Sequence, residues 1–240
     1  MIMNKPDCKS ADLARISEHF QSQNKSPWIW LFIGDSITHG AAHTHGFRSF
    51  PEIFAERIRW ELLLRKDLII NSGISGRTCF DLLNDGYDHL VRRHHAEVVF
   101  VLIGTNDIAR YNDSGLFRQY LTELVDRLRA EGSIPIMQTC TSVLKVEDNE
   151  GYILRYNQLP LYNSIIREIA EEKSIILVDH AAHWQKIAAD ELSLKRLLGE
   201  PIHPGGAGHL EMAKEIFRTL GIYDAESNSA NPSGTPYSLL

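Results

Sequence analysis

A serine and a histidine that lie far apart in the sequence are the first candidates for chemistry. Ser36 lies in the segment LFIGDSITHG (31–40), where an apolar run gives way to small and polar residues. His203 lies in the segment EPIHP, late in the chain. A serine hydroxyl attacks an acyl group when a base such as histidine removes its proton. Ser36 and His203 are therefore candidates for the nucleophile and the general base of an acyl transfer.

A catalytic histidine also needs a hydrogen-bond acceptor on its second ring nitrogen, because that contact fixes the tautomer that can accept the serine proton. Glu200, three residues before His203, offers a carboxylate. The proline that follows it, Pro201, restricts the backbone of Glu200 to extended conformations. Asp179, directly after an apolar run, is a second carboxylate. We favour Glu200 as the partner of His203 and keep Asp179 as the alternative.

The intermediate of an acyl transfer carries a negative oxygen, which requires hydrogen-bond donors placed in advance. The segments NSGISG (71–76) and GTND (104–107) supply glycine N–H groups and the side-chain amide of Asn106. Each feature also has an ordinary structural interpretation. Ser36 is a typical helix cap, Gly76 a typical turn residue, and Asn106 a typical start of a turn. The prediction of chemistry depends on these segments meeting in the folded chain.

The elements that would bring the segments together are short strands alternating with helices. Short, strongly apolar runs are typical of strands buried on both faces of a parallel sheet. The segments between them show helical periodicity. This alternation predicts a three-layer α/β/α fold with a five-stranded parallel sheet. The predicted strands are 28–33, 67–70, 98–103, 134–137 and 175–178, and the predicted helices are 49–65, 114–130, 159–172 and 206–220.

An open sheet of this kind binds ligands outside the carboxyl ends of its strands. The segments that carry Ser36, Gly76 and Asn106 each directly follow a predicted strand. The helix that follows His203 is expected to begin at the same edge of the sheet. The predicted fold therefore gathers a nucleophile, a base, a carboxylate and donors at one edge, which favours catalysis over separate structural roles.

The composition is that of one globular domain with polar extensions. The 240 residues are 43% hydrophobic and 23% charged, which provides ample apolar material for a core. The formal net charge is −6 and no basic run occurs, which disfavours nucleic acid as a partner. We predict an N-terminal arm or short helix over 1–26, a catalytic domain over 27–222, and a flexible tail rich in Ser, Asn, Pro and Gly over 223–240.

The remaining composition signals concern compartment and cysteine chemistry. The sequence shows neither the apolar stretch of a signal peptide nor a segment long enough to span a membrane. A cytoplasmic protein without membrane insertion is therefore expected. The three cysteines, Cys8, Cys79 and Cys140, are widely spaced and odd in number, which argues against a disulfide framework or a zinc site.

Four sequence blocks together resemble a known family. They are GDSI at 34–37, GISG at 73–76, GTND at 104–107 and HP at 203–204. In this order they resemble the SGNH hydrolase superfamily, also called GDSL esterases and lipases. One block alone is a weak signal, whereas four blocks in order over residues 30–210 are a specific one.

The resemblance implies a flavodoxin-like α/β/α fold and a serine esterase that forms an acyl-enzyme. It implies Ser36 as nucleophile and His203 as base. The oxyanion hole would consist of the Ser36 N–H, the Gly76 N–H and the side-chain amide of Asn106. No metal or organic cofactor would be required. One position departs from the family, which usually has Asp three residues before the histidine, whereas this chain has Glu200, one methylene longer.

The segment after Ser36 carries three histidines and an arginine. We predict that His39, His45, Arg48 and, beside Gly76, Arg77 contact a polar or anionic part of the substrate. The alternative is a solvated loop. A metal site formed by the histidines is disfavoured because no carboxylate or cysteine accompanies them in the segment. Because polar residues dominate these loops, we expect short acyl groups, such as acetyl, on a polar or carbohydrate substrate.

The leading hypothesis is therefore an esterase acting on a small-molecule ester. An acyltransferase with the same triad is an alternative, because the sequence does not reveal whether water or another hydroxyl accepts the acyl group. A non-catalytic flavodoxin-like binding module is a second alternative. It is disfavoured because neither G-x-G-x-x-G nor G-x-x-x-x-G-K-[ST] follows any predicted strand.

Overall fold

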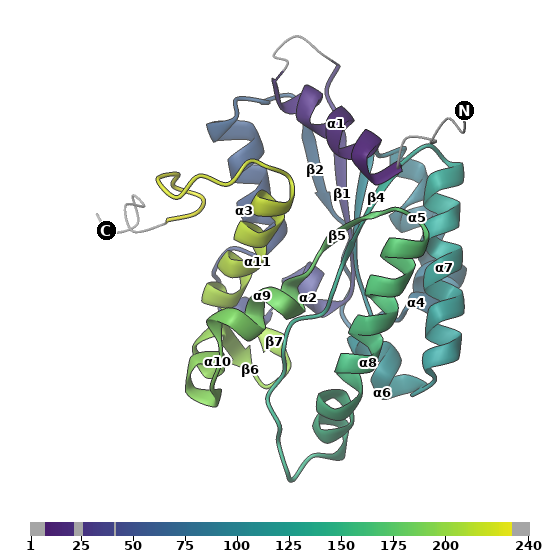
Figure 1. Ribbon diagram of the computed structural model, residues 1–240, viewed down its shortest axis with the longest axis vertical. Helices are drawn as coiled ribbons and strands as arrows, with labels where there is room; N and C mark the ends of the chain where they lie inside the picture. The colour runs from purple at the N-terminus through teal and green to yellow at the C-terminus, as the bar shows by residue number, and fades with distance from the viewer. Residues whose placement is uncertain (1–7, 22–25, 41, 232–240) are drawn as a thin grey trace, which may run out of the picture.

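A parallel sheet forms the centre of the computed structural model, which describes residues 8–21, 26–40 and 42–231 (Figure 1). The strands lie in the order β2-β1-β3-β4-β5, and every neighbouring pair is parallel. This order is that of flavodoxin-like folds, so the predicted fold class is confirmed. The strand bounds are β1 Ile29–Gly34, β2 Leu68–Asn71, β3 Val98–Leu102, β4 Ile134–Gln138 and β5 Ile176–Val178.

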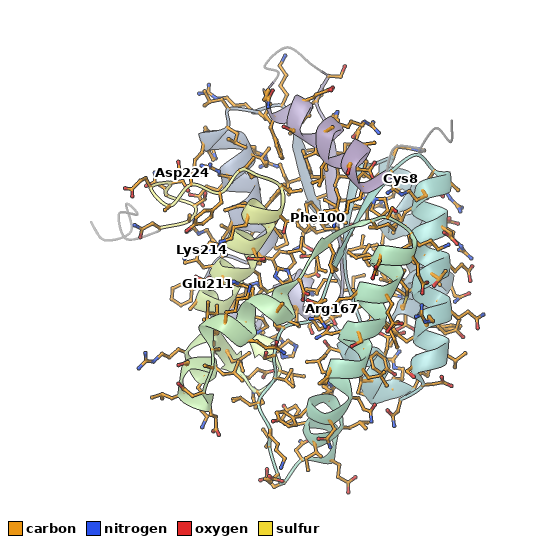
Figure 2. All side chains as sticks on the ribbon, in the orientation of Figure 1. Cys8, Phe100, Arg167, Glu211, Lys214 and Asp224 are labelled. Carbon is orange, nitrogen blue, oxygen red and sulfur yellow. The ribbon has the colours of Figure 1, made fainter. Side chains whose placement is uncertain are left out.

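Both faces of the sheet are covered by helices, because successive strand residues point to opposite faces. On β1, Phe32 belongs to the core on one face and Ile33 to the core on the other. Phe100 of β3 lies on the same face as Phe32, and Figure 2 shows it near the middle of the molecule. The first face packs against α1 (Cys8–Gln21), α3 (Phe50–Glu56), α9 (His180–Ile187) and α11 (Gly206–Thr219), and the second against α4 (Cys79–Asp81), α5 (Tyr87–Leu90), α7 (Ser114–Ala130) and α8 (Glu150–Glu172).

Two helices differ from their predicted extent. α8 begins at Glu150, nine residues before the predicted start at 159. Its first turn is capped by the side chain of Asn149, which accepts a hydrogen bond from the Tyr152 N–H at 3.1 Å, and Pro160 lies inside the helix instead of opening it. The predicted helix 49–65 is α3 followed by a wider π-helical turn, η2 (Arg57–Glu61).

A small hairpin that the sequence pattern did not indicate carries two of the predicted site residues. It consists of β6 (Leu198–Glu200) and β7 (His203–Pro204), which pair antiparallel and place Glu200 opposite His203. The short helix α10 (Glu191–Leu197) directly precedes the hairpin. Other short helical segments follow strands of the main sheet: α2 (Ser36–His39) and η1 (Ala42–Thr44) after β1, and α6 (Thr105–Arg110) after β3. In Figure 1, α2 lies just below the middle of the molecule and β6, β7 and α6 lie below it, at the end of the sheet away from α1.

Both ends of the described chain pack on the domain. In α1, Ile16 is buried and His19 lies 2.7 Å from Asp67, measured between Nε2 and Oδ2. At the other end, the Ser229 hydroxyl donates to Glu61 at 2.5 Å. The last residues of the predicted flexible tail, 232–240, lie outside the described part of the chain. Among the described helices, none has the length and apolar character needed to cross a membrane.

Candidate active site

Ser36 opens α2 at the carboxyl end of β1. The preceding residue, Asp35, caps this helix, and its carboxylate accepts a hydrogen bond from the Ile37 N–H at 2.9 Å. Gly34 allows the strand to end here, because a Cβ at this position would lie 2.2 Å from the carbonyl oxygen of Leu102 on the neighbouring strand. The turn therefore holds the serine at the sheet edge where the predicted site residues were expected to meet.

His203 lies between Ser36 and Glu200. Its Nε2 is 2.7 Å from the Ser36 Oγ, and its Nδ1 is hydrogen-bonded to Oε1 of Glu200. A neutral His203 that donates Nδ1–H to Glu200 presents the lone pair of Nε2 to the serine hydroxyl. The structure thus brings the predicted nucleophile, base and carboxylate into one hydrogen-bonded row.

The alternative carboxylate, Asp179, is engaged elsewhere. It accepts two hydrogen bonds from Arg167, at 2.7 and 2.9 Å, and caps α9 through the Ala182 N–H at 3.1 Å. Glu200 instead reaches His203 across the β6–β7 hairpin, where the two residues form a register pair. The extended backbone before Pro201, which the sequence indicated, fits this hairpin geometry.

The segments that carry the predicted oxyanion donors contact one another. The Ile74 N–H donates to the Gly34 carbonyl at 3.1 Å, which holds the loop after β2 beside the end of β1. The Asn106 side-chain amide donates to the Arg77 carbonyl at 3.1 Å, which ties α6 to the residue after Gly76. Among the described residues, the backbone N–H groups of Ser36 and Gly76 donate no hydrogen bond to a protein acceptor. Both N–H groups are therefore available to a ligand, and their role as oxyanion donors stays a prediction.

His43 joins this site, although no sequence pattern distinguishes it from the two neighbouring histidines. Its ring stacks on that of His203, with centroids 3.6 Å apart and planes 7° from parallel. Its Nδ1 lies 3.5 Å from Oε1 of Glu200. The three side chains offer ligand atoms within 4.8 Å of one another. Parallel rings, however, cannot both aim an in-plane lone pair at one ion, so this geometry fits a hydrogen-bonded cluster better than a metal site.

The four predicted substrate-contact residues have different surroundings. His39 is exposed, and its Nδ1 lies 3.2 Å from the Ser75 hydroxyl. His45 is exposed. Arg48 forms an ion pair with Glu56 of α3, and Arg77 donates to the Asp81 carbonyl at 3.3 Å. Arg48 is thus committed to a protein partner in this structure, while the proposed role of the others in substrate binding stays a prediction.

Burial shifts the titration of several groups around the serine. It raises the pKa of Asp35 to about 7 and the pKa of Asp107 to about 7. Burial lowers the pKa of His203, and the neighbouring His43 lowers it further, against the opposing effect of Glu200. Because a general base must be neutral to accept a proton, the lowered pKa keeps His203 competent at mildly acidic pH.

Asp107 has a testable effect on stability. One carboxylate oxygen accepts the Cys79 N–H at 2.9 Å, and the other has no partner among the described residues. Because the pKa of folded Asp107 is raised, stability falls as the pH rises from about 4 towards 7. The variant Asp107→Asn keeps the acceptor but cannot ionise. We expect the difference in Tm between Asp107→Asn and wild type to be larger at pH 8 than at pH 5, by roughly 3–8 °C.

The matched control for this prediction is Asp113→Asn, which alters an exposed aspartate that caps α7 and whose capping role asparagine can take over. Thermal unfolding followed by circular dichroism at both pH values measures the effect. An equal change in Tm at pH 5 and pH 8 for Asp107→Asn would contradict the prediction.

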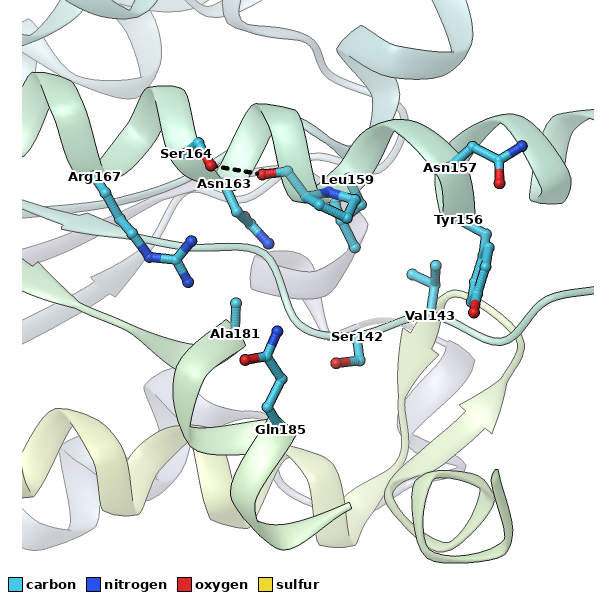
Figure 3. Close-up of a pocket in the computed structure, with 11 residues that line it drawn as sticks. Ser142, Val143, Tyr156, Asn157, Leu159, Asn163, Ser164, Arg167, Ala181 and Gln185 are labelled. Carbon is cyan, nitrogen blue, oxygen red and sulfur yellow. Dashed lines mark hydrogen bonds between the residues drawn. The ribbon is translucent and has the colours of Figure 1, made fainter. Parts of the chain in front are cut away.

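A groove of about 470 Å³ lies between α8 and α9 (Figure 3). The Leu144 N–H, beside the groove, donates to the Pro201 carbonyl at 2.8 Å, which connects the groove wall to the β6–β7 hairpin. Arg155, next to Tyr156, donates to the Thr105 carbonyl at 3.2 Å, beside Asn106. These two bonds connect residues next to the groove with the hairpin and with α6, whereas the groove itself is lined by none of the predicted site residues. Its lining residues are Ser142, Val143, Tyr156, Asn157, Leu159, Pro160, Asn163, Ser164, Arg167, Ala181 and Gln185.

Comparison with known sequences gives a family match. The model of the GDSL-like Lipase/Acylhydrolase family matches residues 32–210. The chain is 28% identical, over 207 residues, to an acetylxylan esterase of Geobacillus stearothermophilus. The alignment covers 80% of this chain and 93% of that protein. It is also 26% identical, over 198 residues, to an uncharacterized lipoprotein, YqeF, of Bacillus subtilis, which covers 70% of this chain and 78% of that protein.

Solved structures share the fold. Axe2, an acetylxylan esterase from Geobacillus stearothermophilus, superposes with a TM-score of 0.65 at 22% identity, covering 83% of this chain and 97% of Axe2. LAE5, an α/β hydrolase from the metagenome of Lake Arreo, Spain, gives a TM-score of 0.70 at 20% identity, covering 83% of this chain and 98% of LAE5. At this level of identity the likeness concerns the fold.

Proposed function

We propose that this chain, which belongs to the GDSL-like lipase/acylhydrolase family and is a carboxylic ester hydrolase, removes acetyl groups from carbohydrate esters. The reaction would proceed by serine catalysis. The observation that carries the mechanism is the hydrogen-bonded row of Ser36, His203 and Glu200, with 2.7 Å between the Ser36 Oγ and the His203 Nε2. A serine, a histidine and an acceptor in this order are the minimum set for nucleophilic acyl transfer.

The first half-reaction acylates the serine. His203 Nε2 takes the proton of Ser36 as the Oγ attacks the carbonyl carbon of the ester. Glu200 stabilises the resulting imidazolium through Nδ1–H. The N–H groups of Ser36 and Gly76 and the amide of Asn106 are the candidate donors to the oxyanion. His203 then gives its proton to the departing alcohol oxygen, which leaves an acetyl-Ser36 ester.

The second half-reaction releases the acid. A water molecule enters where the alcohol has left, and His203 removes its proton as the water oxygen attacks the acetyl carbon. The collapse of this second tetrahedral intermediate breaks the bond to Ser36, and His203 returns the proton to Oγ. The products are acetate and the regenerated hydroxyl, and no cofactor is needed to balance these steps.

The proposal of a carbohydrate ester is supported by two observations. The acetylxylan esterase of Geobacillus stearothermophilus is similar over most of both chains. The groove between α8 and α9 has both polar and apolar walls, and among the described residues the side chains of Ser142, Asn157 and Gln185 have no hydrogen-bond partner. Tyr156, which is 44% exposed, lines the groove (Figure 3) and follows Arg155, which donates to the Thr105 carbonyl of α6. Amides, hydroxyls and an aromatic ring suit a sugar, which has both hydroxyls and apolar faces.

Acetate release from acetylated xylooligosaccharides and the hydrolysis of p-nitrophenyl acetate, butyrate and octanoate test this proposal. We expect hydrolysis that declines steeply as the acyl chain lengthens, together with acetate release from the oligosaccharide. No hydrolysis of any ester would overturn the catalytic proposal, and a preference for octanoate would overturn the acetyl assignment. Transfer of acetyl to an added sugar in preference to water would favour the acyltransferase alternative.

If the sugar chain binds in the groove, a substitution there should affect large substrates more than small ones. In the variant Tyr156→Ala, we expect kcat/KM for an acetylated xylooligosaccharide to fall by about 10-fold, since a lost stacking surface weakens binding of the sugar chain. The value for p-nitrophenyl acetate should stay within about 2-fold of wild type, because this ester is too small to occupy the groove. Tyr223→Ala, which removes an exposed tyrosine at the end of α11, is the control. An equal loss on both substrates would contradict a role for the groove.

A further inference from the structure

The segment that carries His43 is fixed against the β6–β7 hairpin. Thr44 is buried, and its hydroxyl donates to the Gly40 carbonyl at 3.1 Å, which folds the segment back toward α2. On the hairpin side, a Cβ at Gly199 would lie only 2.5 Å from the carbonyl oxygen of His43. Such a close approach is possible because Gly199 has no side chain. The position of His43 relative to Glu200 and His203 is therefore set by tight backbone packing.

The side chain of His43 contacts both the base and the carboxylate. Its ring covers one face of the His203 imidazole at 3.6 Å, nearly parallel. Its Nδ1 lies 3.5 Å from the Glu200 oxygen that accepts the hydrogen bond of His203. The Glu200 side chain is 37% exposed and the His203 side chain 11%. A carboxylate with that much exposure can turn away from the imidazole toward solvent. A second contact to the carboxylate, such as that of His43, opposes this movement.

We propose that His43 is a positioning residue of the esterase: its stacked ring stops the His203 imidazole from turning, and its Nδ1 helps to retain the Glu200 carboxylate. This inference rests on the proposed function. Ring rotation would remove Nε2 from the Ser36 hydroxyl and Nδ1 from Glu200 together, so a small angular change would break both hydrogen bonds. Positioning of this kind acts on kcat, because it affects the reacting geometry and leaves the binding surface intact.

The same contact makes the pH profile depend on His43. The groups that face the His43–His203 pair are Glu200 of β6, Ser36 of α2, Arg155 of α8 and His209 of α11. Of these, Arg155 and His43 both lower the pKa of His203, in addition to its burial, while Glu200 raises it. Removing the His43 imidazole is therefore expected to raise the pKa of His203 and to move the acid limb of kcat/KM to higher pH.

Two substitutions separate the effect of the stacked ring from the effect of its nitrogen atoms. His43→Phe keeps an aromatic ring over His203 and removes the titratable nitrogen, whereas His43→Ala removes both. We expect kcat for p-nitrophenyl acetate to fall about 10-fold in His43→Ala with little change in KM, and to stay within about 3-fold of wild type in His43→Phe. Both variants should shift the acid limb upward. His89→Ala, an exposed histidine on α5, is the control for loss of a surface histidine.

Nitrogen-15 NMR of the histidine rings gives a readout that does not require turnover. The titration midpoint of His203 should be higher in His43→Phe than in wild type, and this measurement stands even if no ester is hydrolysed. If the wild-type protein showed no esterase activity, the proposed function would be overturned. The NMR titration would still test the role of His43 separately. The inference is wrong if both His43 variants match His89→Ala in kcat and pH profile and leave the His203 midpoint unchanged.

Discussion

Replacing Ser36 by alanine is expected to lower kcat for p-nitrophenyl acetate by about 10⁴- to 10⁶-fold, the range seen when a triad nucleophile is removed. The reason is geometric, because Ser36 Oγ is the hydroxyl that lies 2.7 Å from the Nε2 of His203. His203→Ala should cost a similar amount, since the two residues act as one unit. The double variant is then expected to be no worse than either single variant, because each change alone already removes the acyl-enzyme route.

The measurement needs a control for general damage and a direct test of the covalent step. Ser17→Ala changes a half-buried serine on α1, at the opposite edge of the sheet, and should leave kcat unchanged. A fluorophosphonate should add its mass to one peptide of wild type, the peptide containing Ser36. Labelling of another residue, or turnover by Ser36→Ala within 10-fold of wild type, would show that the nucleophile lies elsewhere.

Replacing Asn106 by alanine is expected to lower kcat by about 10²- to 10³-fold with little change in KM, as happens when one oxyanion donor is lost. One N–H of its amide donates to the Arg77 carbonyl at 3.1 Å, and this bond orients the group beside Gly76. The second N–H is then the one available to the oxyanion. An interaction made only with developing charge changes kcat and kcat/KM together.

Asn84→Ala is a matched control for this substitution, because the Asn84 amide also donates to a backbone carbonyl, that of Phe80, at 2.9 Å and at an exposed site. It removes the same kind of local bond without removing a donor from the site. If Asn106→Ala lost no more kcat than Asn84→Ala, the amide would have only a structural role, and the oxyanion hole would have to consist of backbone N–H groups.

Much of the fold was accessible from the sequence because its strands are buried on both faces. Such strands are short, uninterrupted apolar runs, and all five were found within one residue of their observed bounds. The resemblance to SGNH hydrolases is confirmed by the family match over residues 32–210. The predicted start of α8 was wrong because all of its buried residues lie from Leu159 onward, so the first nine residues of the helix carry no apolar face that a periodic pattern would show.

The parts of the site that escaped prediction depend on contacts between distant segments. The β6–β7 hairpin has strands of three and two residues, too short for any periodic pattern. His43 was one of three histidines in seven residues, and its selection depends on backbone packing at Gly199, more than 150 positions later in the sequence. The sequence analysis favoured Glu200 over Asp179, but it did not indicate the ion pair with Arg167 that holds Asp179 elsewhere.

The candidate site consists of two parts: the base and carboxylate lie on the β6–β7 hairpin, and the nucleophile lies on a segment far away in the sequence. The base and its carboxylate are register partners within one short hairpin, so their contact depends on that hairpin alone. The nucleophile belongs to a turn 167 residues earlier in the chain. A partly opened molecule could keep its sheet and its acid–base pair and still have no reactive serine. Ester hydrolysis would thus serve as a sensor of docking between hairpin and sheet, with a sensitivity that bulk spectroscopic signals of secondary structure lack.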